Sequence, residues 1–109
     1  MNYSFEITDD FAKELKALAK KYASIRSDIL KLQQSIIENP EQGIELGGGF
    51  RKIRFSISSK NKGKRSGGRV ITYEIIFNTE NEKIIFVAIY DKSEYVSIDL
   101  NLIRKSLGL

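Results

Sequence analysis

The positively charged residues that could bind phosphate are concentrated in one part of the sequence. Eight of the eighteen lysines and arginines lie within positions 51–69, and no acidic residue occurs between Glu45 and Glu74. Clustered cations of this kind attract phosphate groups, so the pattern indicates a phosphate-rich partner, most often a nucleic acid. The alternative is a solvated basic loop with no ligand. Apolar strand patterns flank the cations on both sides, which indicates that a fold holds them in place.

Neither histidine nor cysteine occurs in the chain. Their absence excludes disulfide bonds and thiolate chemistry, and it removes the usual general base and the usual zinc ligand. Any acid–base chemistry would therefore use Lys, Arg, Tyr, Asp or Glu side chains. Asp91 and Glu94 are a weak candidate for a catalytic carboxylate pair. The sequence has no metal-ligand cluster, phosphate-binding P-loop or nucleophile motif, so we expect neither a metal nor a cofactor.

The size and composition are those of a single globular domain spanning residues 1–109. Apolar residues make up 41% of the chain and charged residues 29%, and the net charge is only +4 because the acidic residues lie before and after the basic region. The first ten residues carry acidic side chains and lack the apolar stretch of a signal peptide. No apolar run approaches the length of a transmembrane helix. We therefore expect a cytoplasmic protein with no membrane partner.

The N-terminal part of the sequence predicts a strand followed by two helices. Apolar and polar residues alternate over positions 2–7, which predicts a half-buried strand. Apolar residues then recur at helical spacing, first in a helix capped within residues 8–10 and then in a second helix that opens at Ser24. The second helix ends at Asn39-Pro40, because a residue before proline avoids the helical region. Two helices so close in sequence predict an antiparallel hairpin.

The C-terminal part predicts an antiparallel meander of three strands and a final short helix. Residues 40–49 contain four glycines and are predicted as a loop, and Ser97 can cap the last helix. The predicted strands cover residues 53–57, 69–77 and 84–90, separated by a basic glycine-rich loop at 58–68 and a turn at 78–82. The element order β-α-α-β-β-β-α predicts a two-layer α+β fold, with the helical hairpin on one face of the sheet and the other face partly open.

The predicted meander brings basic residues from three strands to one end of the sheet. Lys52 and Arg54 lie two positions apart, so they point to the same side of their strand. Arg69 begins the next strand, and Tyr90 and Lys92 lie where the last strand ends. Guanidinium and ammonium groups gathered there would bind phosphate oxygens.

The aromatic and glycine residues in this region each allow two interpretations. Tyr73 and Tyr90 could stack on unpaired bases, as in proteins that bind single-stranded RNA. Tyr73 lies in a central strand, however, where a core position is the stronger interpretation. Gly63, Gly67 and Gly68 would let the backbone approach a ligand closely, or simply make the loop flexible.

Four segments together resemble the HigB-type toxins of the RelE/ParE superfamily. They occur in the family's order and spacing and cover nearly the whole chain; they are Asn39-Pro40-Glu41-Gln42-Gly43, Gly49-Phe50-Arg51-Lys52-Ile53-Arg54, residues 62–71 (KGKRSGGRVI) and Tyr90-Asp91-Lys92-Ser93-Glu94. The resemblance implies a toxin of a bacterial type II toxin–antitoxin system, with a cognate antitoxin as partner. It also implies a RelE-like fold and cleavage of mRNA in the ribosomal A site, without a metal, by attack of the ribose 2′-hydroxyl on the adjacent phosphate.

The resemblance also implies roles for individual residues. Arg69 would contact the scissile phosphate and stabilise its charge, with Lys64 and Arg54 assisting, and Lys92 or Tyr90 would transfer the proton. Some relatives carry an arginine where this chain has Ser93, which leaves the choice between Lys92 and Tyr90 open. The residues implied to bind mRNA or ribosomal RNA are Arg51, Lys52, Lys60, Lys62, Arg65 and Tyr73.

Two other functions fit the same fold. ParE-like members of the superfamily bind DNA gyrase and do not cleave RNA, and a third possibility is a non-toxic relative that only binds RNA or its partner. The dense run of lysine, arginine and glycine favours the nuclease, since a gyrase inhibitor needs no phosphate-binding surface. An acidic antitoxin segment on the basic face, or an antitoxin strand added to an open sheet edge, would neutralise the toxin.

Overall fold

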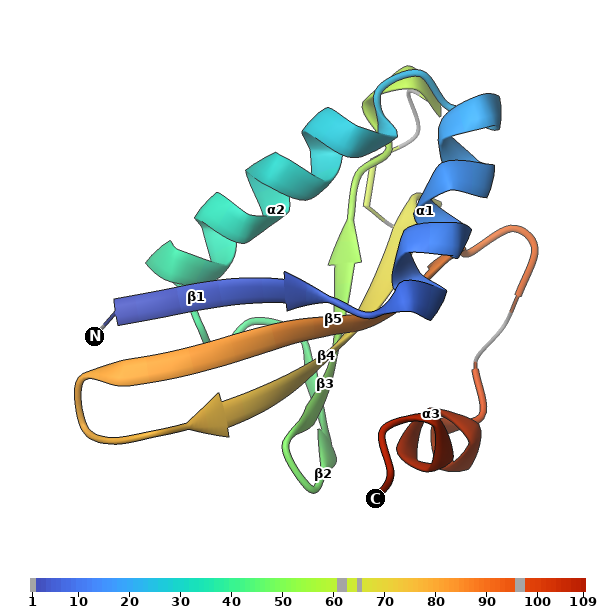
Figure 1. Cartoon of the computed structure of the whole chain (residues 1–109). Coiled ribbons are helices and arrows are strands. Elements are labelled where there is room, and N and C mark those ends of the chain that lie inside the picture. Colours follow the sequence, from blue (N-terminus) through green and yellow to red (C-terminus); the bar gives the residue numbers. More distant parts are fainter. Residues whose placement is uncertain (1, 61–62, 65, 96–97) are drawn as a thin grey trace.

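The computed structural model describes residues 2–60, 63–64, 66–95 and 98–109, and it confirms the predicted α+β fold class. Within these residues, three α-helices and one five-stranded sheet are present (Figure 1). The elements are β1 (Asn2–Ile7), α1 (Asp9–Lys21), α2 (Ile25–Glu38), β2 (Ile44–Gly47), β3 (Phe50–Phe55), a 3₁₀ turn η1 (Ser58–Lys60), β4 (Gly68–Ile76), β5 (Asn81–Asp91) and α3 (Leu100–Ser106).

The sheet has the strand order β1-β5-β4-β3-β2. Strands β3, β4 and β5 pair antiparallel, as the meander prediction requires, and β1 pairs parallel with β5. The prediction of a loop over residues 40–49 was wrong in part, because residues 44–47 form β2, which pairs antiparallel with β3. Gly48 (φ 62°) and Gly49 (φ 88°) adopt left-handed conformations between β2 and β3. These glycines therefore form the tight turn of a hairpin.

Helices α1 and α2 form the predicted hairpin over one face of the sheet (Figure 1). Thr8 caps α1, since its hydroxyl oxygen accepts a hydrogen bond from the Phe11 backbone N–H at 3.1 Å. The largest buried cluster lies between the helices and the sheet. It contains Phe11, Leu15, Leu18, Ile25, Ile29, Leu32, Ile36, Ile53, Phe55, Ile57, Val70, Ile84, Phe86 and Ile89.

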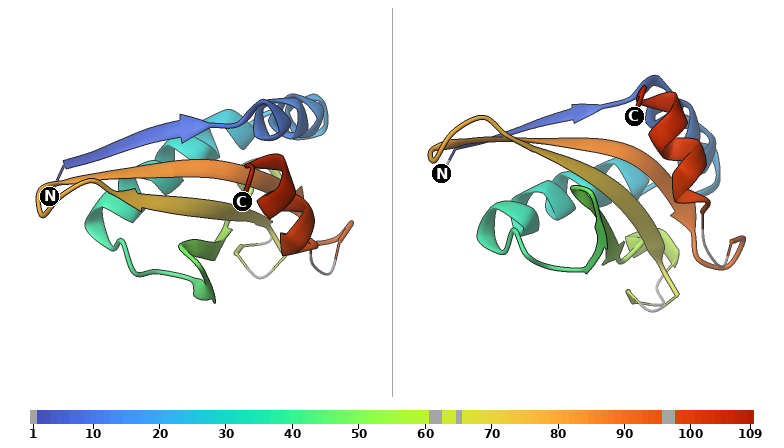
Figure 2. Two further views of the ribbon diagram at one scale, coloured as in Figure 1. Left: turned by 60° about the horizontal axis from the view of Figure 1, so that its bottom comes forward. Right: turned by 90° about the horizontal axis from the view of Figure 1, so that it is seen from below.

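Helix α3 covers part of the opposite face of the sheet (Figure 2). Ile103 of α3 packs there in a second, smaller cluster with Phe50, Ile71, Val87 and Ala88. Asp99 is the N-cap of α3, and its carboxylate accepts a hydrogen bond from the Asn101 backbone N–H at 2.9 Å. Ser97, which the sequence suggested as the cap, lies outside the described residues.

Glu14 lies beside the outer edge of β5, where β1 no longer covers it. The parallel pairing with β1 ends at Ile7 and Phe86, and beyond that point the Glu14 carboxylate accepts a hydrogen bond from the Ile89 backbone. Burial raises the pKa of Glu14, the Ile89 hydrogen bond lowers it and the negative charge of Asp10 raises it, and the net pKa is about 6. The Glu14 carboxylate is therefore harder to ionise in the folded protein than in the unfolded chain.

We expect Glu14→Gln to stabilise the protein above about pH 6 and to have little effect at low pH. The folded pKa of about 6 lies above the ordinary value of 4.5, so ionised Glu14 weakens the fold at high pH, and this penalty disappears as the pH falls from 6 to 4.5. A shift of this size corresponds to about 2 kcal/mol, which solvent screening of a half-exposed group reduces to about 1 kcal/mol or less. Thermal melts across this range would test it, with Glu80→Gln, an exposed change of the same charge, as control. A gain from Glu14→Gln that is equal at all pH values would contradict the prediction.

Candidate nucleic-acid interface

Three of the predicted catalytic residues lie in one row across the sheet. In the register of β3, β4 and β5, Arg54 is directly opposite Arg69, and Arg69 is directly opposite Tyr90. Directly opposed residues of neighbouring strands point to the same face and lie within contact range. The prediction that these strands bring the three residues together is therefore confirmed, and we call Arg54, Arg69 and Tyr90 the cross-strand row.

The three members of the cross-strand row differ in exposure. Arg54 is exposed, whereas Arg69 is 4% and Tyr90 2% exposed. Burial lowers the pKa of the Arg69 guanidinium, and the neighbouring Arg54 charge lowers it further. Burial also raises the pKa of Tyr90, although the Arg69 charge opposes this. Tyr90 therefore stays protonated at neutral pH, and its hydroxyl has no hydrogen-bond partner among the described residues.

Arg69 supports the basic segment, a name we use for the described residues 58–60, 63–64 and 66–68. Its Nη1 donates hydrogen bonds to the backbone carbonyls of Lys64 at 2.9 Å and Gly68 at 3.0 Å. The guanidinium thus holds the backbone at Lys64, whose side chain is exposed. Direct contact between Arg69 and a scissile phosphate stays a prediction.

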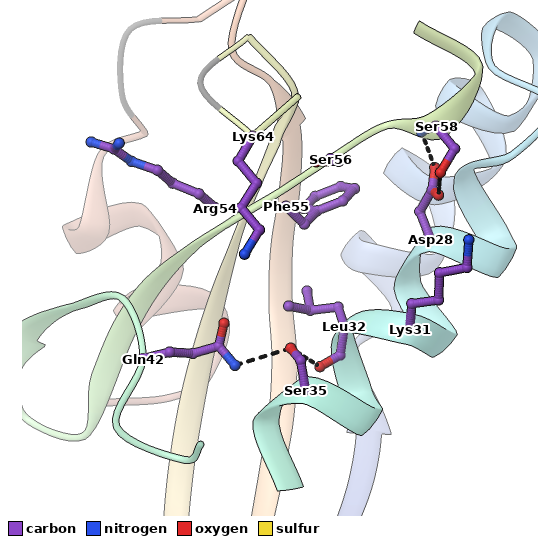
Figure 3. Close-up of a pocket in the computed structure, with 10 residues that line it drawn as sticks. All are labelled: Asp28, Lys31, Leu32, Ser35, Gln42, Arg54, Phe55, Ser56, Ser58 and Lys64. Carbon is purple, nitrogen blue, oxygen red and sulfur yellow. Dashed lines mark hydrogen bonds between the residues drawn. The ribbon is translucent and has the colours of Figure 1, made fainter. Parts of the chain in front are cut away.

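A groove with basic walls lies beside this segment, between α2 and β3 (Figure 3). One pocket of about 190 Å³ lies against α2, and a second of about 350 Å³ lies against residues 42–44 and β3. Lys64 and Arg54 line both pockets, and Figure 3 shows the Lys64 ammonium pointing toward Gln42 while Arg54 extends away from α2. Lys31 and Lys52 add positive charge at either end.

Three cations of the groove are available to a ligand. Among the described residues, no acidic side chain forms a salt bridge with Lys52, Arg54 or Lys64. Strand β2 pairs with β3 only as far as Lys52, so the outer edge of β3 at Arg54 has no neighbouring strand in the described part of the chain. The groove therefore combines unpaired positive charge with an open strand edge.

Two residues predicted to bind RNA are instead paired within the protein. Arg51 forms a salt bridge with Glu74 at 3.4 Å and donates a hydrogen bond to the Glu41 carbonyl. Lys60 donates to the Asp91 carboxylate at 2.6 Å. These contacts reduce the charge that Arg51 and Lys60 offer to a phosphate. A direct role of the two residues in RNA binding stays a prediction.

The other predicted site residues lie nearby with different environments. Tyr73 is half-buried and its ring packs on Phe50 at a centroid distance of 4.7 Å, which agrees with the core interpretation. Lys92 is half-buried in the turn after β5, and its backbone N–H donates to Gly67. Lys62 and Arg65 lie outside the described residues.

Gly67 and Gly68 serve close packing within the protein. A Cβ atom at Gly67 would lie 2.2 Å from the Phe55 carbonyl oxygen, and one at Gly68 would lie 2.3 Å from the Phe55 ring. The end of the basic segment thus approaches β3 too closely for any larger residue. Packing against Phe55 is therefore sufficient to explain why glycine occupies both positions. The idea that these glycines let the backbone approach a ligand stays a prediction.

We expect Gly67→Ala to destabilise the protein by about 1–3 kcal/mol. The contact is with backbone, so the overlap is relieved only if the basic segment moves away from β3. Gly63→Ala is the matched control, because a Cβ there meets no atom within 4 Å, although its φ of 69° adds some strain. Chemical denaturation of both variants tests this, and equal losses at the two glycines would contradict the packing explanation.

Two buried acids have structural partners that the sequence did not reveal. Asp91 is completely buried and binds Lys60, Tyr22 and Ser93, so the structure adds no support for the weak candidate of a catalytic carboxylate pair with exposed Glu94. Asp28 of α2 is 3% exposed and accepts hydrogen bonds from the backbone and side chain of Ser58. Asp28 was detectable as an acid on the apolar face of a helix, between Ile25 and Leu32.

The sequence pattern of the ParE toxin family of type II toxin–antitoxin systems (parDE) matches residues 5–95. The chain belongs to this family. It is thus a type II toxin of the RelE/ParE superfamily, and a toxin of this kind has a cognate antitoxin as its partner. The match does not name the HigB branch, which stays a prediction. Over the described residues, none of the toxin's helices is long and apolar enough to cross a membrane.

Proposed function

We propose that this toxin is a ribosome-dependent mRNA endonuclease. The observation that carries the proposal is the cross-strand row next to the unpaired cations of the groove. This arrangement combines exposed charge for a phosphate, from Arg54 and Lys64, with the buried, protonated phenol of Tyr90 in the same row. Charge for the phosphate and a group that can exchange a proton are what a metal-independent phosphoryl transfer uses.

In this proposal the protein positions one ribose and its 3′-phosphate for internal attack. The 2′-hydroxyl loses its proton and its oxygen bonds to phosphorus, the bond to the 5′-oxygen breaks, and that oxygen takes up a proton. The products are a cyclic phosphate end and a 5′-hydroxyl end. Arg54 and Lys64 bind the phosphate oxygens as negative charge accumulates on them. Arg69 holds the backbone at Lys64. Tyr90 or Lys92 takes part in the proton transfer between the two ribose oxygens.

The test incubates a defined mRNA with purified toxin, once in a translation reaction and once without ribosomes, and maps any cuts by primer extension. The proposal expects discrete cuts in the reading frame that require ribosomes. Intact mRNA with normal protein synthesis would reject it.

A second candidate is inhibition of DNA gyrase, which the match to the ParE family favours. Gyrase binding requires no unpaired cation groove, so the groove geometry favours the nuclease. A supercoiling assay with purified gyrase separates the two, because only a gyrase inhibitor would block supercoiling while leaving ribosome-bound mRNA intact.

A further inference from the structure

The basic segment is held at both of its ends at Asp91, by the side chain at one end and by the backbone at the other. Lys60, at the start of the segment, donates from Nζ to Asp91 Oδ1 at 2.6 Å. At the other end, Gly68 pairs with Asp91 in the sheet, and the next residue, Lys92, donates its N–H to the Gly67 carbonyl at 3.1 Å. The two ends are therefore fixed to the same point at the end of β5.

The remaining contacts of Asp91 make this point rigid. Tyr22, which follows α1, donates its hydroxyl proton to Oδ2 at 2.5 Å, and Ser93 donates both its N–H and its hydroxyl to Oδ1 at 2.9 and 2.8 Å. Lys60 Nζ also lies 5.7 Å from the centre of the Tyr22 ring. Asp91 is completely buried and the Lys60 side chain is 12% exposed. A buried, fully hydrogen-bonded ion pair fixes geometry more effectively than an exposed one.

Burial by itself would raise the pKa of Asp91, but the hydrogen bonds from Lys60, Tyr22 and Ser93 outweigh it and hold the pKa well below its usual range. Asp91 is therefore ionised at neutral pH. A second buried acid, Asp28, holds Ser58 in the same turn through hydrogen bonds of 2.9 and 2.6 Å. Two carboxylates thus anchor the turn from which the basic segment starts.

We propose that Asp91 is a positioning residue for the nucleic-acid interface, acting with Lys60 and Tyr22 as a clamp that sets where Lys64 lies beside Arg54. Asp91 and Lys60 do not touch the RNA in this arrangement. Their effect is to hold the segment in its binding geometry before the ligand arrives, so that less conformational entropy is lost on binding. The proposal rests on the proposed RNA-binding function for its affinity prediction only.

The charge change of Asp91→Asn makes the test decisive. The variant is one unit more positive than the parent protein, so simple electrostatics predicts tighter RNA binding. Positioning predicts the opposite, namely about tenfold weaker binding of a fluorescein-labelled oligouridine of about twelve nucleotides, measured by anisotropy. Glu80→Gln, an exposed acid at the turn before β5, is the matched control and should bind the RNA at least as tightly as the parent protein.

Amide hydrogen exchange tests the clamp without any RNA. In Asp91→Asn we expect the amides of Lys60 and Lys92 to exchange at least about tenfold faster, while the Ile71 amide in the centre of β4 is unchanged. If Asp91→Asn does not fold, Tyr22→Phe takes its place, because it removes a single hydrogen bond and should show smaller changes in the same direction. Exchange that stays unchanged in the folded variant overturns the proposal.

A double variant shows whether Lys60 acts through Asp91. We expect Lys60→Met to weaken RNA binding and the pair Asp91→Asn/Lys60→Met to be no weaker than the worse single variant. Losses that multiply would mean that Lys60 binds RNA independently, and they would overturn the clamp. If the parent protein binds no RNA at all, the proposed function fails, while amide exchange still decides the clamp.

Discussion

Replacing Arg54 and Lys64 together with alanine is expected to lower the rate of the proposed ribosome-dependent mRNA cleavage by about 10²- to 10³-fold. Both side chains are exposed, both line the two pockets of the groove, and neither forms a salt bridge with a described residue. Their loss removes positive charge from the place where a phosphate would develop negative charge. Primer extension of translated mRNA and growth of cells that express the variant would measure the effect.

The same double variant should fold normally. Exposed side chains with no buried partner contribute within about 0.5 kcal/mol each, so its melting temperature should match that of the parent protein. Lys16→Ala/Lys20→Ala is the control, because it removes the same charge from exposed positions of α1, away from the groove. Equal loss of cleavage in both double variants would show that overall charge, and not this groove, drives RNA binding.

Phe86→Ala is expected to destabilise the protein by about 3–5 kcal/mol. Phe86 is completely buried, and its ring packs on Phe11 of α1 at 5.4 Å and on Phe5 of β1 at 5.9 Å between centroids. It also lies opposite Ile7 at the last pair of the β1–β5 ladder. One side chain therefore joins the first strand, the first helix and the longest strand, and its removal leaves a cavity that none of them can fill alone.

Chemical denaturation and thermal melting would measure this loss. A typical domain is stable by about 5–15 kcal/mol, so the variant would retain a fraction of its stability or unfold at body temperature. Phe77→Ala is the control, since Phe77 is 59% exposed immediately after β4, where Lys83 lies over its ring. A comparable loss at Phe77 would indicate that aromatic content, and not the Phe86 packing, determines stability.

Local patterns in the sequence were sufficient for most of the fold. The helical hairpin, the antiparallel meander and the pairing of Arg54, Arg69 and Tyr90 follow from apolar periodicity and from short connections between strands. The strand at 44–47 was missed because it is short, largely exposed and ends in a run of three glycines, Gly47 to Gly49. Pairing with β3 stabilises this strand, and the strand propensities of its own residues do not reveal that partner.

Which cations remain available could not be predicted from the sequence. Lys60 and Lys64 are four positions apart in the same basic run, yet Lys60 is paired with Asp91 while Lys64 faces the groove. The difference arises from a partner thirty-one positions away along the chain. Arg51 is likewise paired with Glu74 of the neighbouring strand. Charge density along a sequence therefore indicates that a partner is phosphate-rich, and only tertiary pairing shows which side chains can reach it.

The parallel ladder between the first and the longest strand affects the order of events during synthesis. Asn2 pairs with Asn81 and Ile7 with Phe86, so β1 leaves the ribosome long before its partner exists. Tyr90 and Asp91, at the end of β5, are also needed to complete the cross-strand row and to close the clamp on Lys60. Contacts between residues so far apart form late in folding. A nascent chain would thus lack the complete cross-strand row and the Lys60–Asp91 contact for most of its own synthesis. If the toxin cleaves mRNA as proposed, it could do so only after its own chain is nearly complete.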